Sequence, residues 1–230
     1  MKSAQATPSA VAAFIRTNLQ PQPVPLVPEI QIYTAHPASG LGSFLGAGAQ
    51  APYWAYPWAG GIALARYVLD HPETVRGRSV LDVGAGAGLV AVAAALAGAS
   101  RVTAVERDAN AVVEIELNAA LNRVALGIRH EDLGHRRELP DAQVILAGDV
   151  FYDARVARQN AAVLDVYRAL GAHILVGDPG RAHLPLEGLR RLAEYRLDDF
   201  GDTPQAHSTP SAVFAAVADL APFGRAGDRP

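Results

Sequence analysis

Residues 79–88 read SVLDVGAGAG, and this stretch decides the fold. A short apolar run that carries Asp82 ends in a glycine turn made by Gly84, Gly86 and Gly88. An alanine-rich stretch of helical character follows, and the next apolar run, VTAVERD, ends in an acid. A strand, a glycine turn, a helix and a second strand closed by an acid form half of a nucleotide-binding sheet.

The spacing of the turn favours one class of nucleotide. In a dinucleotide site a third glycine lets helix and strand close around a pyrophosphate; here Leu89 stands at that position. Asp82 lies two residues before the first glycine, where its charge would repel a pyrophosphate but suit an ammonium and a sulfonium. The segment therefore favours S-adenosylmethionine as ligand. A dinucleotide site and a plain strand–helix turn are the alternatives.

Two further acids fit such a donor. Glu106 lies 22 residues after Gly84, where a carboxylate at a strand end can accept both ribose hydroxyls. Asp132, in HEDL after the next expected strand, could accept a hydrogen bond from the adenine amino group. The alternative for each is a solvated acid in a turn.

The candidate acceptor site begins at Asp149, which follows the apolar run AQVILAG and opens the sequence DVFYD. Its strand should lie at the switch point of a doubly wound sheet, where ligands bind beyond the strand ends. A carboxylate beside Phe151 and Tyr152 could hold an amine and shield it from water. Methyl transfer is a direct displacement, so the site must align the reactants and present the amine unprotonated. The alternative is an acid that caps the following helix.

Aromatic and basic residues surround these acids in the sequence. PYWAYPWAGG (52–61) is dense in aromatic residues, which suits either the wall of a pocket or core packing. GDPGR (177–181) leaves a strand as a tight turn, and Arg181 could meet an acidic partner or solvate the rim. The histidines have no metal-ligand spacing, so no metal is expected.

Alternating strands and helices predict an α/β fold with a mainly parallel, Rossmann-like sheet and right-handed crossovers. Helices are expected at residues 9–18, 60–70, 88–97, 108–121, 154–170 and 184–193. Strands are expected at EIQIYT, 79–83, 101–105, 126–130, 142–148, 172–177, 195–200 and 211–217, the last two as an antiparallel hairpin. We expect residues 1–58 to form an N-terminal extension with a loop at 35–52. Residues 59–217 should form the main domain, and residues 218–230 a flexible tail.

Composition narrows the function classes. The chain has 230 residues, half of them apolar, and a net charge of −3 without a Lys/Arg block, which argues against a nucleic-acid partner. It has no cysteine, so disulfides and thiolate chemistry are excluded. No apolar run approaches a membrane span. We expect a cytoplasmic monomer.

Several segments together resemble one family: VPEI, PYWAYPWAGG, SVLDVGAGAGLVAVAA, LNAALN, AGDVFYD and LVGDPGR. They are similar to the lysine methyltransferases of the electron transfer flavoprotein beta subunit, especially the bacterial members. The resemblance covers nearly the whole chain. It implies a seven-strand methyltransferase fold, S-adenosylmethionine as donor, and the flavoprotein beta subunit as protein substrate.

The resemblance also implies roles for individual residues. Those matching the donor-binding motifs are Asp82, Gly84, Gly86, Gly88, Glu106 and Asp132, with Trp58 at the pocket edge. Asp149 and Tyr152 match the motif near the substrate amine, and Asp149 is also assigned to the donor. The chain departs from relatives at Glu106, where Asp is usual, and in the Gly/Ala-rich stretch 38–51. A small-molecule N-methyltransferase of the nicotinamide type and a non-enzymatic binding domain are the competing hypotheses.

Overall fold

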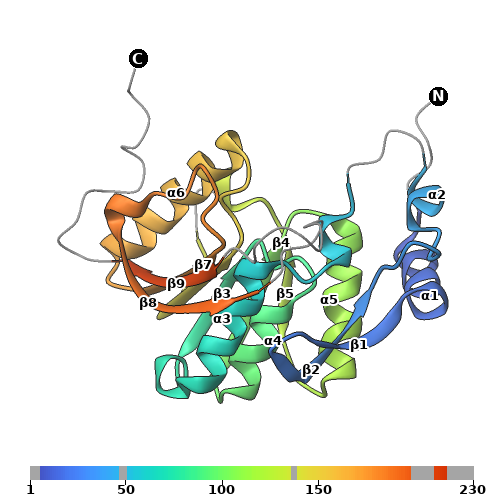
Figure 1. The fold of residues 1–230 in the computed structure, drawn as a ribbon, viewed down its shortest axis with the longest axis horizontal. Helices are drawn as coiled ribbons and strands as arrows, with labels where there is room; N and C mark the ends of the chain where they lie inside the picture. The colour runs from blue at the N-terminus through green and yellow to red at the C-terminus, as the bar shows by residue number, and fades with distance from the viewer. Residues whose placement is uncertain (1–5, 47–50, 136–138, 198–209, 217–230) are drawn as a thin grey trace.

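The computed structural model describes residues 6–46, 51–135, 139–197 and 210–216 (Figure 1). The predicted tail at 218–230 lies outside them. Within this part of the chain, seven strands form one sheet in the order β5-β4-β3-β6-β7-β9-β8. Their bounds are β3 (Ser79–Val83), β4 (Arg101–Glu106), β5 (Gly127–His130), β6 (Val144–Gly148), β7 (His173–Asp178), β8 (Leu189–Arg196) and β9 (Pro210–Ala216).

The sheet has the predicted topology. Strands β3 to β7 pair in parallel, and β9 runs antiparallel between β7 and β8. The strand order reverses between β3 and β6, so the carboxyl ends of these two strands border the switch-point crevice where such sheets bind ligands. The expected seven-strand, mostly parallel α/β fold with its antiparallel C-terminal pair is confirmed.

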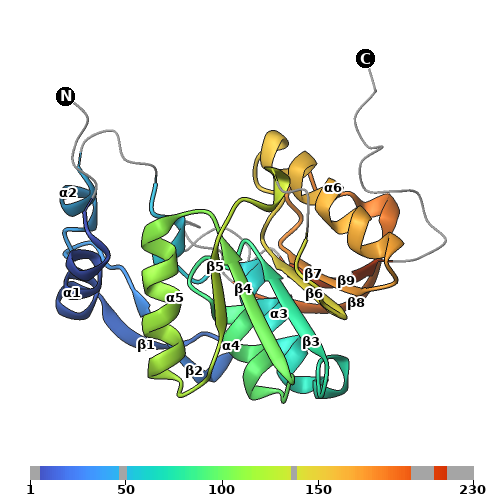
Figure 2. The same ribbon diagram turned by 180° about the vertical axis from the view of Figure 1, so that it is seen from behind.

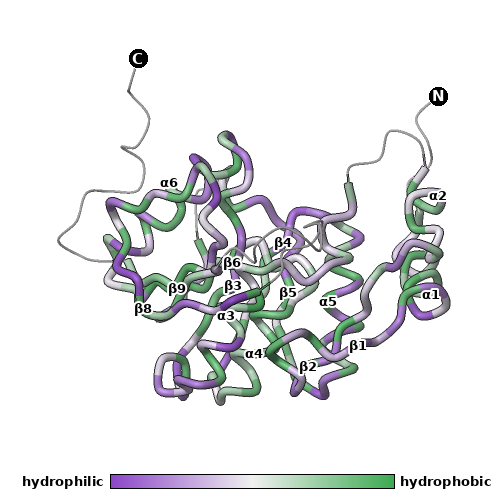
Figure 3. The backbone as a smooth tube through the Cα atoms, viewed as in Figure 1, coloured by the Kyte–Doolittle hydropathy of each residue, from purple (hydrophilic) through white to green (hydrophobic). Residues whose placement is uncertain are grey.

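Helices cover both faces of the sheet (Figure 2). Helices α3 (Ala59–Asp70), α4 (Leu89–Leu96) and α5 (Ala109–Leu121) lie on one face, and α6 (Ala154–Ala169) on the other. Alternation along β6 explains this, because Val144 and Leu146 join the core under α3 and α4, whereas Ile145 joins the core under α6. Helix α4 is largely hydrophobic (Figure 3) and packs on β3 and β4.

The N-terminal segment packs beside the sheet. It contains α1 (Pro8–Asn18), the antiparallel pair β1 (Gln20–Val24) and β2 (Val27–Thr34), and α2 (Leu41–Leu45) within the stretch expected to be a loop. Two side-chain amides, one in α5 and one directly after it, bind the free edge of β2: Asn118 Oδ1 accepts from the Tyr33 N–H at 2.9 Å, and Asn122 Oδ1 accepts from the Gln31 N–H at 2.9 Å. Strand edges need such cover, and here side-chain amides supply it.

The prediction of a helix at residues 184–193 is wrong. A short 3-10 helix (Leu186–Gly188) leads into β8, which covers the second half of that range. The sequence LEGLRRLAEY has helix-forming residues with leucines at helical spacing, but pairing with β9 overrides that local preference. The strand expected at 195–200 therefore begins earlier, and residues 198–200 lie outside the described part.

Glycines bring α3 into backbone contact with two strands. A Cβ atom placed on Gly177 of β7 would lie 2.1 Å from the Gly60 carbonyl oxygen and 2.7 Å from Leu64 Cβ. A Cβ atom on Gly148 of β6 would lie 2.9 Å from Gly61 Cα. The first turn of α3 therefore rests directly on the carboxyl ends of β6 and β7, where no side chain fits between them.

Gly177→Ala tests this contact. We expect the free energy of unfolding to fall by about 3 kcal/mol, because the new methyl group meets backbone atoms that cannot turn aside. Gly42→Ala is the control, since a Cβ there meets nothing within 4 Å and that position is helical; we expect no loss. Denaturant unfolding of the two variants measures both values. Equal stability of the two would show that the close packing of α3 is not required.

Candidate active site

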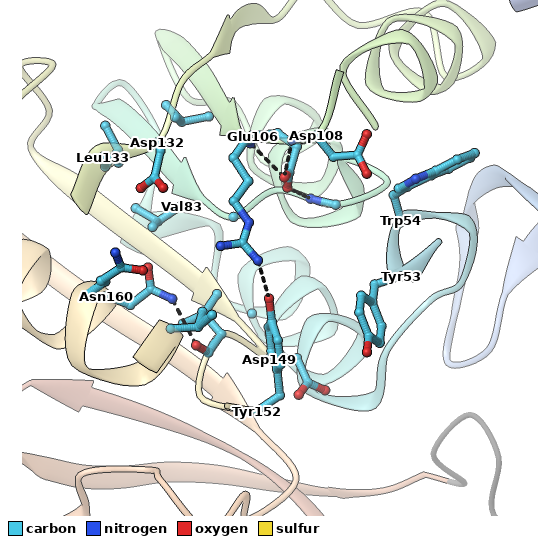
Figure 4. A pocket seen from close by; sticks show the side chains of 18 of the residues that line it. Tyr53, Trp54, Val83, Glu106, Asp108, Asp132, Leu133, Asp149, Tyr152 and Asn160 are labelled. Carbon is cyan, nitrogen blue, oxygen red and sulfur yellow. Dashed lines mark hydrogen bonds between the residues drawn. The ribbon is translucent and has the colours of Figure 1, made fainter. Parts of the chain in front are cut away.

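A pocket of about 340 Å³ opens at the carboxyl ends of β3, β4 and β6 (Figure 4). Most of the residues singled out from the sequence line it: Trp58, Gly84, Gly86, Glu106, Asp132, Asp149 and Tyr152. Asp82 and Gly88 do not. Figure 4 shows Glu106 and Asp108 on one side, with Asp149 and Tyr152 facing them. The volume lies within the range of about 300–1,000 Å³ found for small-molecule sites.

Glu106 is held by backbone donors. Its Oε2 accepts from the Gly86 N–H at 2.9 Å, and its Oε1 accepts from the N–H groups of Arg107 at 2.7 Å and Asp108 at 3.0 Å. A carboxylate offers about four acceptor positions, so about one is left for a ligand hydroxyl. The geometry fixes this carboxylate at the glycine loop; its role with a ribose stays a prediction.

The three loop glycines have different tasks. All have positive φ, which a side chain would strain. A Cβ on Gly86 would meet nothing within 4 Å, so this residue faces open space beside the pocket. A Cβ on Gly88 would lie 3.1 Å from Ile115 Cγ2, so Gly88 allows α4 to begin close against α5. The third glycine thus serves packing, and only the first two border the pocket.

Asp82 lies beneath the loop. It is 1% exposed, and its Oδ2 accepts from the Ala91 N–H at 3.0 Å in the first turn of α4. Burial raises the pKa of Asp82 to about 8; the Ala91 N–H opposes this rise and the charge of Glu106 adds to it. The carboxyl therefore anchors α4 to β3. Its predicted contact with the charged groups of a donor is not tested by this geometry.

Asp149 forms the opposite pole of the pocket. It has a φ of +58°, and its N–H donates to the Gly177 carbonyl at 2.8 Å. Its carboxylate accepts from the Gly60 N–H at 3.2 Å and from the Arg181 guanidinium at 2.8 and 3.2 Å. The side chain is only 5% exposed. The α6 helix is capped by Asp153, so the alternative role of Asp149 as a helix cap is wrong.

Aromatic rings form the wall between the poles. Tyr53 lies with its ring centroid 5.9 Å from that of Trp58 and 5.8 Å from that of Tyr152. The indole N–H of Trp58 donates to the Tyr53 carbonyl at 2.7 Å, which fixes the ring orientation. Arg107 reaches to the Tyr152 hydroxyl at 3.4 Å, and partial burial raises the pKa of Tyr152, so this hydroxyl stays protonated near neutral pH.

Most of the chain resembles curated proteins of one kind. It is 41% identical over 170 residues to the electron transfer flavoprotein beta subunit lysine methyltransferase of Xenopus laevis, covering 71% of this chain and 69% of that protein. Over 169 residues it is 39% identical to the rat protein of the same name, covering 71% of this chain and 66% of that one. The chain belongs to the electron transfer flavoprotein beta subunit lysine methyltransferase family.

Other comparisons agree with the enzyme class. Residues 64–148 match the family model of ribosomal protein L11 methyltransferase. Two solved structures share the fold: Thermoplasma acidophilum 1320, with a TM-score of 0.53 and 17% identity over 67% of this chain and 88% of that one, and a 16S rRNA methyltransferase of T. Thermophilus, with a TM-score of 0.51 and 23% identity over 74% and 44%. The expected methyltransferase class is confirmed by the curated relatives, and these two structures confirm the fold. No helix among the described residues is long and apolar enough to cross a membrane.

Sequence reasoning missed part of the site of this family member. The sequence allows Arg181 either to meet an acidic partner or to solvate the rim, and the structure pairs it with Asp149. The Gly60 N–H and Arg107 were not anticipated. One signal in the sequence points to the pairing of Arg181 with Asp149. The segments GDVF and GDPGR stand at the ends of neighbouring parallel strands, whose carboxyl ends lie side by side.

Asp82→Asn tests the buried carboxyl. The pKa of Asp82 is raised in the folded chain. Between about pH 4 and pH 8 the folded chain therefore keeps a proton that the unfolded chain has lost. The stability of the wild type falls as pH rises through this window. Asparagine keeps the acceptor for Ala91 and does not titrate. The stability of the variant relative to wild type should therefore rise by about 1.4 kcal/mol per pH unit.

Urea unfolding of both proteins at pH 5.5, 6.5 and 7.5 measures this difference. Other buried acids are present in both proteins and cancel in the comparison. A constant difference across the three pH values would show that Asp82 is ionised in the folded protein.

Proposed function

We propose that this protein transfers a methyl group from S-adenosylmethionine to lysine side chains of an electron transfer flavoprotein beta subunit. The observation that carries the acceptor is the likeness to curated relatives named for that activity, at 41% identity for the Xenopus laevis protein. The observation that carries the chemistry is a single pocket with a backbone-held carboxylate at one pole and a buried carboxylate among aromatic rings at the other.

The pocket fits the donor. S-adenosylmethionine, when bound, supplies an activated methyl group on a positively charged sulfur. Glu106 offers an acceptor for a ribose hydroxyl at the glycine loop. Val83, Val105 and Leu133 supply apolar lining for an adenine ring, and Asp132 lies beside them for its amino group. The open space next to Gly86 allows a ligand to approach the backbone closely.

The opposite pole suits an amine. Asp149 lies at the end of β6, and the rings of Tyr53, Trp58 and Tyr152 lie beside it. A lysine side chain is long enough to extend its amine past such a wall while its peptide stays outside. Protonated Tyr152 can accept or donate a hydrogen bond but does not act as a base. The pocket therefore has to orient the amine and to keep water out.

The direct test is incubation with labelled S-adenosylmethionine and purified flavoprotein beta subunit. Wild type should label lysine residues of that subunit. Asp149→Asn should lower turnover at least 10-fold while it stays folded, because asparagine fits the same backbone but has one acceptor oxygen, so it cannot accept both hydrogen bonds from Arg181 and no longer fixes the geometry of the pocket. Circular dichroism controls the fold. Labelling of a free amine instead of the subunit would favour the small-molecule enzyme, and wild-type turnover in Asp149→Asn would contradict the acceptor site.

Glu106→Gln tests the donor pole. Loss of one charged acceptor should weaken binding of S-adenosylmethionine by about 1.5–3 kcal/mol, roughly 10-fold to 150-fold in Kd. Glu116→Gln is the matched control, because Glu116 is an exposed acid on α5 outside the pocket. Isothermal titration calorimetry with the donor measures both. Equal affinities in the two variants would place the ribose elsewhere.

A further inference from the structure

Three features hold Arg181 against the acceptor pole, the end of the pocket that Asp149 forms. Its backbone N–H donates to Asp178 Oδ1 at 2.7 Å in the turn after β7. Its guanidinium binds Asp149 as a fork, with Nε 2.8 Å from Oδ1 and Nη2 3.2 Å from Oδ2. Its Cζ atom lies 5.9 Å from the centre of the Trp58 ring. Planar two-point pairing of this kind fixes both side chains in one arrangement.

The pairing changes the charge that an incoming amine meets. Asp149 alone would be a buried negative charge and would stabilise a lysine ammonium. With Arg181 the two side chains sum to zero, and the fork and the Gly60 N–H already occupy three acceptor positions of the carboxylate. An ammonium therefore finds little compensation for the water that it loses among the aromatic rings.

Other ionisable groups face this pair from neighbouring elements. Asp178 at the end of β7 is buried, and desolvation raises its pKa to about 6, with Asp149 adding to the rise and Arg181 opposing it. From the far side of the pocket come Arg107 and the acids Glu106, Asp108, Glu131 and Asp132. Desolvation raises the pKa of Tyr152, so its hydroxyl is neutral near pH 7. Above about pH 6 Asp178 is ionised, so the group formed by Asp149, Arg181 and Asp178 carries a net negative charge and loses its cation when Arg181 is removed.

We propose that Arg181 is a positioning residue that neutralises Asp149 and thereby makes the pocket select the unprotonated form of the acceptor amine. This inference rests on the proposed function and extends it to the substrate's protonation state. The ammonium gives its proton to water as it enters. The nitrogen lone pair then forms the N–C bond to the methyl group, while the C–S bond breaks and leaves its electron pair on sulfur. The methylated ammonium product is free to lose a proton to solvent after release.

The first experiment is the pH dependence of methyl transfer to the flavoprotein beta subunit in wild type, Arg181→Gln and Arg181→Lys. Loss of a cation a few ångströms from the amine should move the rising limb of the kcat profile to higher pH by about 1–3 units. Turnover of Arg181→Gln should therefore be low at neutral pH and recover at high pH. Arg181→Lys keeps the charge, so its limb should stay near that of wild type.

Arg191→Gln is the matched control. Arg191 makes an ion pair with Glu194 at 2.7 Å on the exposed strand β8, outside the pocket. The substitution changes the net charge of the protein by the same amount as Arg181→Gln. We expect its profile to coincide with that of wild type.

A second measurement does not depend on turnover. The flavoprotein beta subunit is titrated into each variant saturated with S-adenosylhomocysteine, in buffers of different ionisation enthalpy at pH 8. Wild type should release about one proton per amine bound, because a free lysine amine has a pKa of about 10.4 and is charged at this pH. Arg181→Gln should release clearly less.

The outcomes separate the two proposals. Wild-type transfer with an equal fold-loss at every pH in Arg181→Gln would show a merely structural role and overturn the inference alone. Higher turnover of Arg181→Gln at neutral pH would show that Arg181 competes with the substrate, and would overturn it as well. Absence of both transfer and binding in wild type would overturn the acceptor assignment, and this inference with it.

Discussion

The backbone contact between α3 and the ends of β6 and β7 is the constraint on which the site depends. Gly60 lies against Gly177 and Gly61 against Gly148, with no room for a side chain on Gly60, Gly148 or Gly177. This closeness lets the Gly60 N–H reach the Asp149 carboxylate and places Trp58, which precedes α3, at the pocket wall. Three sequence segments that are far apart in the chain, WAGG, GDVF and GDPGR, are therefore parts of a single structural unit.

Around that unit, three acids near the pocket are accommodated in three different ways. Glu106 accepts hydrogen bonds from three backbone N–H groups. Asp82 is buried and keeps its proton over most of the physiological range. Asp149 is buried and balanced by a guanidinium. The same functional group, a carboxyl, thus yields a fixed acceptor, a neutral anchor and a neutral ion pair, and burial together with the nearest donor decides which form each acid takes.

The sequence predicted what local pattern controls. The glycine loop at 84–88, the alternation of strands and helices, and the position of Asp149 at the switch point all follow from periodicity and turn chemistry. It could not predict what long-range contact controls. Residues 189–193 lie in a stretch with helical spacing but become part of an edge strand through pairing with β9, and the fork of Arg181 on Asp149 joins residues 32 positions apart. Asp82 shows the same limit of sequence-based prediction. Its position before the glycine loop can be read from the sequence, whereas its burial depends on the packing of distant residues.

The backbone at Asp149 adds an independent argument for its carboxylate. A φ of +58° is strained for any side chain and is the conformation that glycine adopts at no cost. Aspartate tolerates it better than most residues, yet glycine would be more relaxed. Strain of this kind persists where surrounding contacts hold the residue in place. Asp149 is held by hydrogen bonds with the Gly177 carbonyl, the Gly60 N–H and the Arg181 guanidinium. The turn after β6 therefore holds a charged group in place at the expense of backbone stability, which is the expected arrangement when the group is needed for chemistry and not for folding.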